Sequence, residues 1–253
     1  MQDSTVASEG PNRLPPQAEH YLARAYHRDE NEEIRTAVIR LKGGPIREEL
    51  WKRDKLDIAL LDIYDVVYVI DYPGIAYLNG IDGRIFTDSP TATLRKLQES
   101  LNIVVEDGVI YDVVAESFGA FLLLQIEDVP NEVRRIFAVS TMCSYSNIEK
   151  FAANAVSPDL LDEINDAKRR TVLAWQHKNA CSVPSYSKPI WFVHGTDDSK
   201  EPINLIHGIQ GLSTDYKLFA VEDVGHNVPA GVTSAVIKMS FAAPAARSKG
   251  GEQ

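Results

Sequence analysis

The stretch YDVVAESFG at residues 111–119 decides the fold that this chain is expected to adopt. Its first five residues have the apolar, β-branched character of a buried strand, and an apolar helical run follows within a few residues. Between the two stands Ser117, with Ala115 two residues before it and Gly119 two residues after it. Small residues at these positions allow a tight turn in which the strand and helix backbones approach closely. Such a turn would raise the serine hydroxyl clear of the backbone.

Strand and helix patterns alternate on both sides of this stretch. The predicted strands cover residues 36–41, 66–71, 111–115, 135–139, 190–194 and 216–221, and the predicted helices cover 47–62, 91–101, 118–126, 203–212 and 231–241. This alternation predicts crossover connections and hence an α/β fold with a mostly parallel central sheet. The runs VVYVI at 66–70 and IWFV at 190–193 are almost continuously apolar, as expected of strands covered by helices on both faces.

The domain boundaries follow from composition. A chain of 253 residues is long enough for one domain with a large core, predicted here over 34–243. Residues 1–33 are polar and charged and predict a flexible or lid-like arm, and 244–253 predict a disordered tail. Residues 146–187 carry helical but no strand pattern and predict a small helical cap above the sheet. The alternative for this last segment is an ordinary crossover helix with long loops.

Charge and cysteine content exclude several function classes. A net charge of −10 disfavours nucleic acid as a partner. No apolar run is long enough to span a membrane, and the first residues lack the pattern of a signal peptide, so a cytoplasmic location is expected. Two cysteines provide neither a disulfide framework nor metal-ligand spacing. We therefore expect no metal and no cofactor, and we leave a homodimer open.

Two further strand ends carry polar side chains suited to catalysis. Residues 189–198, PIWFVHGTDD, form a strand that ends in a glycine turn with carboxylates, and residues 221–227, VEDVGHN, place a histidine after the last strand. Functional groups in open parallel sheets gather at the carboxyl ends of the strands. Ser117, Asp198 and His226 are therefore expected to meet at one edge.

This order of motifs resembles the α/β-hydrolase superfamily over about residues 36–241. Residues 115–119, AESFG, resemble its nucleophile elbow G-x-S-x-G with the first glycine replaced by alanine. Residues 194–198, HGTDD, resemble the HGxxD turn, whose final aspartate is the acid of the triad, and residues 225–226 resemble the Gly-His pair before the last helix. The acid is thus expected to be Asp198 rather than Asp197.

The resemblance implies a role for each residue of the triad. Ser117 would be the nucleophile and His226 the general base that takes its proton and later hands it to the leaving group. Asp198 would fix the tautomer of the imidazole and stabilise its cation.

A fourth motif, LKGGP at residues 41–45, follows the first strong strand. It resembles the oxyanion loop of esterases and prolyl peptidases, which has HGG-type or GGP-type sequences. The resemblance implies an oxyanion hole formed by the backbone N–H of Phe118 and one N–H from Gly43 or Gly44.

Each of these residues also has a purely structural interpretation. Ser117 could cap its helix, His226 could lie on the surface, and the Gly-Gly-Pro turn could be only a turn. Asp197 and Asp198 could cap a helix starting near Pro202. His194 and Cys143 are expected to be structural, and Asp223 is a lesser candidate for the acid. The joint occurrence of the motifs in one order, each at a strand end, favours the triad.

We therefore expect a serine hydrolase that cleaves an ester, thioester or amide bond of a small-molecule or short-peptide substrate. Glu116 beside the nucleophile resembles the G-E-S-A-G elbow of carboxylesterases, which favours an esterase or thioesterase. The Gly-Gly-Pro loop and, weakly, the stretch from Asp71 to Phe86 resemble prolyl oligopeptidase-type peptidases.

Two departures from the family pattern keep a different class open. Lys42 stands where histidine is frequent, and Ala115 replaces a glycine. The alternative is a non-hydrolytic tailoring enzyme, such as an isomerase or lyase, or a binding protein that uses the same pocket. A nucleotide-binding domain is disfavoured because the chain has neither a G-x-G-x-x-G turn nor a Walker-type loop.

Overall fold

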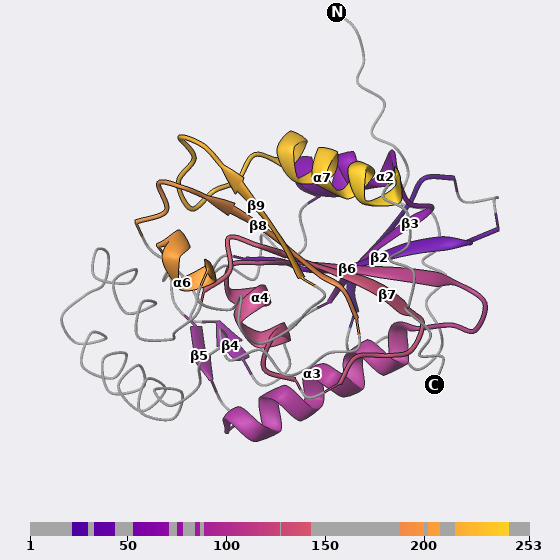
Figure 1. Ribbon diagram of the computed structural model, residues 1–253. Coiled ribbons are helices and arrows are strands. Elements are labelled where there is room, and N and C mark those ends of the chain that lie inside the picture. Colours follow the sequence, from indigo (N-terminus) through magenta and orange to yellow (C-terminus); the bar gives the residue numbers. More distant parts are fainter. Residues whose placement is uncertain are drawn as a thin grey trace, which may run out of the picture.

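A seven-stranded sheet with helices on both faces forms the body of the molecule in this computed structural model (Figure 1). The structure describes residues 22–29, 33–43, 53–70, 75–77, 84–86, 89–126, 128–142, 188–199, 202–207 and 216–242. The predicted cap at 146–187, the tail at 244–253 and Gly44 lie outside the described residues.

The sheet has the strand order β1-β3-β2-β6-β7-β8-β9. Its strands are β1 (Leu22–His27), β2 (Thr36–Leu41), β3 (Val66–Ile70), β6 (Ile110–Glu116), β7 (Val133–Val139), β8 (Ile190–Gly195) and β9 (Tyr216–Val221). All neighbouring pairs are parallel except β1 with β3, which is antiparallel. The α/β class and the mostly parallel sheet predicted from the sequence are confirmed.

Helices cover the two faces in pairs. Helices α2 (Lys55–Leu61) and α7 (Ala230–Ala242) lie on one face, and α3 (Pro90–Val104) and α4 (Phe118–Leu123) lie on the other (Figure 1). The short helix α6 (Ile203–His207) follows β8 in the chain. No helix in the described part of the chain is long and apolar enough to cross a membrane.

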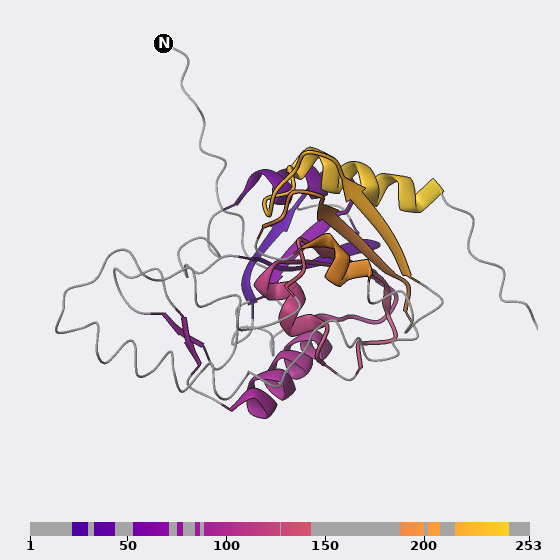
Figure 2. The same ribbon diagram turned by 60° about the vertical axis from the view of Figure 1, so that its left-hand side comes forward.

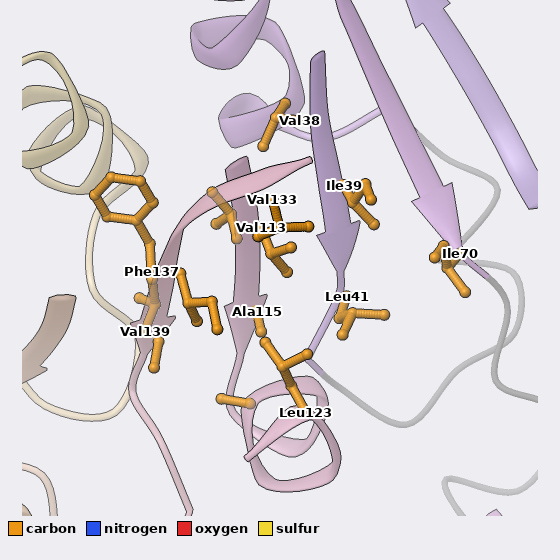
Figure 3. Packing of buried hydrophobic residues seen from close by; sticks show 14 of the residues in the cluster. Val38, Ile39, Leu41, Ile70, Val113, Ala115, Leu123, Val133, Phe137 and Val139 are labelled. Carbon is orange, nitrogen blue, oxygen red and sulfur yellow. The ribbon is translucent and has the colours of Figure 1, made fainter. Parts of the chain in front are cut away.

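The central strands are buried on both faces, which explains their apolar sequences. All five residues of β3 and all six of β8 are buried. Figure 3 shows how Leu123 of α4 points toward Ala115 of β6 and Leu41 of β2, closing one side of the core. Since side chains alternate along a strand, Arg40 and Lys42 face the opposite side, beneath α2.

The order of the strands reverses between β2 and β6. The chain runs from β2 outward to β3 and later returns to add β6 on the other side of β2. Open α/β sheets bind ligands at such a reversal, outside the carboxyl ends of the strands. The carboxyl ends here belong to β2, which leads to Gly43, and to β6, which leads to Ser117.

Three strands were not predicted. Strand β1 falls within the predicted N-terminal arm, so residues 22–27 are an edge strand of the sheet and not a loose segment. Strands β4 (Ile75–Tyr77) and β5 (Arg84–Phe86) form a separate antiparallel ribbon, which lies apart from the main sheet (Figure 2). Helix α2 begins at Lys55, because the side chain of Asp54 caps it by accepting from the N–H of Asp57. The predicted helix covered 47–62, and its residues 47–52 lie outside the described residues.

Candidate active site

Ser117 lies at the junction of β6 and α4 with a backbone conformation that non-glycine residues rarely adopt. Its φ is 48° and its ψ is −110°. A hydrogen bond of 2.8 Å from its N–H to the carbonyl of Val139 on β7 holds the turn. Its side chain makes no capping hydrogen bond to α4, although it occupies the N-cap position. The helix-capping interpretation of this serine is therefore wrong.

The hydroxyl of Ser117 points to His226 instead. Ser117 Oγ lies 2.8 Å from His226 Nε2, and His226 Nδ1 lies 2.8 Å from Asp198 Oδ2. An ionised carboxylate can only accept, so Nδ1 carries the proton and Nε2 of the neutral ring accepts from the serine hydroxyl. Asp198 is 3% exposed, and such burial strengthens the interaction of its charge with the ring.

The loops that carry the acid and the histidine are tied together at Gly195. A Cβ atom at this position would lie 2.0 Å from the carbonyl oxygen of Val224 and 2.4 Å from that of Gly225. Only glycine allows the turn after β8 to pass so close to the residue before His226. The N–H of Asp197 donates to Val224 O at 3.0 Å, which holds the two loops in this arrangement.

The other acidic and imidazole groups of these loops do not replace the triad partners. The hydroxyl of Thr196 accepts from the N–H of Asp223, whose φ of 56° places it in the turn after β9. Among the described residues, the carboxylate bonded to His226 is that of Asp198. His194 is buried with its Nε2 3.4 Å from Asp198 Oδ2, so the acid lies between two imidazoles.

Gly43 brings the loop after β2 into contact with the elbow. A Cβ atom at position 43 would be 3.0 Å from Ser117 Cβ and 3.1 Å from the carbonyl oxygen of Glu116. Phe118, the other predicted oxyanion donor, is the first residue of α4 and follows Ser117 directly in the chain. Residue 43 thus packs against the elbow from the neighbouring strand.

An ionic cluster that the sequence analysis did not identify lies behind the elbow on the α2 face. Its two cations and one of its carboxylates are buried, and the other two carboxylates are partly exposed. The cations are Arg40 of β2 and Lys42, which follows β2. The carboxylates are Asp54 and Asp57 at the start of α2 and Glu116 at the end of β6. Lys42 pairs with Asp57 and, at 3.1 Å, with Asp54. Lys42 therefore serves this cluster, which gives a physical reason for its presence where histidine is frequent.

Arg40 is the centre of the cluster. Its Nη2 lies 2.7 Å from Glu116 Oε2 and its Nε lies 3.3 Å from Asp57 Oδ1. Burial by itself lowers the pKa of Arg40, but the carboxylates of Glu116, Asp57 and Asp54 outweigh it and raise that pKa above its ordinary value. Burial likewise raises the pKa of Asp54, and Arg40 and Lys42 together with a backbone hydrogen bond lower it overall. Both shifts favour the charged forms of Arg40 and Asp54.

A metal centre has no support in the described part of the chain, where no three His, Cys, Asp or Glu side chains are grouped to hold an ion. The site consists of a hydroxyl, an imidazole and a carboxylate in series, with Gly43 packed against the serine and the first turn of α4 directly after it. This arrangement is suited to nucleophilic attack on an electrophilic carbonyl carbon.

Comparisons with known proteins bear on the fold. No protein-family model matches the sequence. A search of curated proteins gives no match either. Solved structures do match. A lipase-esterase related protein from Clostridium acetobutylicum superposes with a TM-score of 0.60 at 15% identity, over 86% of this chain and 98% of that one.

Two further structures agree. A monoacylglycerol lipase from Paleococcus ferrophilus gives a TM-score of 0.52 at 15% identity, covering 87% of this chain and 99% of its own. The mouse alpha/beta hydrolase domain-containing protein 10 gives a TM-score of 0.55 at 13% identity, covering 87% of this chain and 92% of its own. These likenesses show that the chain has the α/β-hydrolase fold, as the sequence motifs predicted.

Proposed function

We propose that this chain, which has the α/β-hydrolase fold, is a serine hydrolase that cleaves an ester, thioester or amide bond through an acyl-enzyme intermediate. One observation carries the proposal. The hydroxyl of Ser117, in a strained turn, is hydrogen-bonded to His226, which is in turn hydrogen-bonded to buried Asp198. Backbone strain persists where the surrounding structure enforces it, and it is concentrated at functional sites.

The acylation step follows from the hydrogen bonds. Ser117 Oγ forms a bond to the carbonyl carbon while His226 Nε2 takes its proton, which gives a tetrahedral intermediate and an imidazolium. The intermediate collapses as the bond to the leaving group breaks and His226 returns the proton to that group. Water then attacks the acyl-enzyme by the same route, which releases the acid and restores the hydroxyl.

Asp198 keeps His226 in the productive tautomer. Its carboxylate accepts from Nδ1, so the lone pair of the neutral ring lies on Nε2, facing Ser117. When the ring becomes cationic, the buried negative charge stabilises it. Loss of that charge would leave the histidine in place but with the wrong tautomer favoured.

The oxyanion is proposed to bind the N–H of Phe118 and an N–H of the loop after β2. Gly43 lies at contact distance from the elbow, which supports its N–H as the second donor, and Gly44 is the alternative from the sequence motif. A donor of this kind is typically worth about 3 kcal/mol of barrier, roughly a hundredfold in rate.

We place esters and thioesters ahead of peptide amides as substrates. Glu116 beside the nucleophile is the residue found in the carboxylesterase-type elbow. Two of the structurally similar proteins are named as a lipase-esterase related protein and a monoacylglycerol lipase. Esters also have better leaving groups than amides, so a small aryl ester is the substrate to try first.

Fluorophosphonate labelling tests the proposal because the reagent phosphonylates only an activated serine. We expect the wild-type chain to gain one adduct, and Ser117→Ala to gain none. The matched control is Ser140→Ala. Ser140 also has a positive φ, 47°, and also follows a strand, but that strand is the neighbouring β7. We expect this control to label like the wild type.

Two outcomes would reject the hydrolase. Folded wild-type protein that gains no adduct would favour the isomerase, lyase or binding alternative, in which the pocket is used without an acyl-enzyme. Labelling that persists in Ser117→Ala and disappears in the control would place the nucleophile elsewhere. Hydrolysis of an aryl acetate, measured on the same three proteins, extends the result from reactivity to turnover.

A further inference from the structure

The nucleophile and the proposed oxyanion loop lie on adjacent strands at the same level. Strands β2 and β6 are parallel and in register, with Leu41 opposite Ala115. Two residues further along each strand stand Gly43 and Ser117, and the space between them would not admit a methyl group without strain. Small relative movements of the two strand ends would therefore change the distance from the serine to its oxyanion donor.

One side chain spans these two strand ends from behind. Arg40 of β2 donates to Glu116, the residue before the nucleophile, at 2.7 Å. The same guanidinium is held by Asp57 at the start of α2. The Arg40 side chain is 0% exposed and that of Glu116 is 26% exposed, so the arginine end of the pair is shielded from solvent.

We propose that Arg40 is a positioning residue of the reaction: its ion pair with Glu116 fixes the elbow at Ser117 against the loop at Gly43. The inference rests on the proposed function, since it concerns the geometry of the same site. Arg40 touches neither substrate nor reacting atoms. It acts through the backbone of residues 116 and 117, because the Glu116 side chain that it holds is attached directly to that backbone.

A purely structural role accounts poorly for this arrangement. Burying a guanidinium carries a large desolvation cost, and well-packed apolar residues of similar volume are often at least as stabilising. Its Nη1 is buried and finds no hydrogen-bond partner among the described residues, which adds to the cost. Asp54 and Asp57 already cap α2 by themselves, so the helix does not require Glu116.

The chain contains a matched control on the same strand. At the opposite end of β6, buried Asp112 accepts from Arg135 of β7, with Nη2 to Oδ2 at 3.1 Å, as well as from Arg134 and Tyr64. This second pair is also a carboxylate of β6 bonded to an arginine of a neighbouring strand. It lies at the start of the strand, far from the nucleophile.

The test compares the two pairs by the rate constant of fluorophosphonate labelling. We expect Glu116→Gln to label about tenfold slower and Arg40→Met about a hundredfold slower, because a misplaced oxyanion donor costs roughly this much. Arg40→Lys should recover part of the loss. Asp112→Asn and Arg135→Met should lose thermal stability yet label at the wild-type rate. The amplitude of labelling reports the folded fraction, so the rate constant is independent of partial misfolding.

The possible results separate this inference from the proposed function. Wild-type protein without an adduct refutes both. Labelled wild type, with Glu116→Gln and Arg40→Met no slower than the Asp112 and Arg135 variants, refutes the positioning role and leaves the hydrolase intact. If Arg40→Met does not fold, Glu116→Gln decides, since it keeps the size of the side chain and removes only its charge.

Discussion

Replacing Gly195 by alanine tests how the triad is assembled, because this change touches no catalytic side chain. The added methyl would lie 2.0 Å from Val224 O, whereas ordinary contacts begin at 3.4 Å. The neighbouring backbone must therefore retreat by about 1.4 Å, since the obstructing atoms are carbonyl oxygens and not flexible side-chain ends. That backbone leads directly into His226.

A shift of this size has a calculable effect. Misplacement of a catalytic group by about 1 Å costs on the order of a hundredfold in rate. Overpacking of a rigid site also lowers the free energy of unfolding by about 1–3 kcal/mol. We therefore expect Gly195→Ala to label with fluorophosphonate about a hundredfold slower than the wild type and to unfold at a lower temperature.

Gly231→Ala is the control for Gly195→Ala. A Cβ atom at Gly231 meets nothing within 4 Å, and the residue lies in helix α7, where alanine is favoured over glycine by up to about 1 kcal/mol. This variant should keep the wild-type labelling rate and its stability or gain slightly. A Gly195→Ala protein that labels as fast as Gly231→Ala would refute the claim that the two loops hold His226 by close contact.

Three further predictions follow from the site. Gly43→Ala should slow labelling about tenfold, which is a smaller effect than that of Gly195→Ala. The new methyl group would be 3.0 Å from Ser117 Cβ, and a few tenths of an ångström of movement would relieve this close contact. An unchanged labelling rate would show that the loop does not bind the oxyanion. Asp198→Asn should reduce the rate of aryl ester hydrolysis on the order of 10⁴-fold with little change in folding, as the corresponding change does in a serine protease triad; a loss of only a few fold would assign the acid elsewhere. Burial raises the pKa of Asp65, but backbone and hydroxyl donors from Arg35 and Thr36 outweigh it and lower that pKa overall. The contribution of Asp65 to stability is therefore present above about pH 4 and lost as the pH falls through the lowered pKa. Between pH 7 and pH 2 the melting temperature of Asp65→Asn should fall less than that of the wild type, and equal falls would contradict this assignment.

The sheet could be predicted from the sequence where its strands are buried on both faces. The predicted strand 36–41 matches β2, and 190–194 is one residue shorter than β8. Strand β1 escaped prediction because its sequence LARAYH mixes charged and apolar residues, as an edge strand can, and its pairing with β3 depends on residues far along the chain. Helix α2 begins at Lys55, where the capping box of Asp54 and Asp57 sets its start.

The candidate triad could be anticipated because its three residues each lie in a short motif at a strand end. The ionic cluster could not, because it joins residues that are separated in sequence and have no common motif. Arg40 and Glu116 are 76 positions apart, and Arg40 occupies a strand position where a buried apolar residue is the usual choice. Lys42 alone gave a signal, as a departure from the expected loop sequence, but its partners in α2 became apparent only from the structure.

Acid-quenched mass spectrometry of the wild-type chain with a slowly turned-over aryl ester tests the central claim most directly. If the relay from Asp198 through His226 activates the serine, peptide mapping will find the acyl group on the oxygen of residue 117. It will form in a burst whose amplitude equals the concentration of folded protein. Ester hydrolysis that proceeds with the acyl group on another residue, or with none bound to the chain, would contradict it.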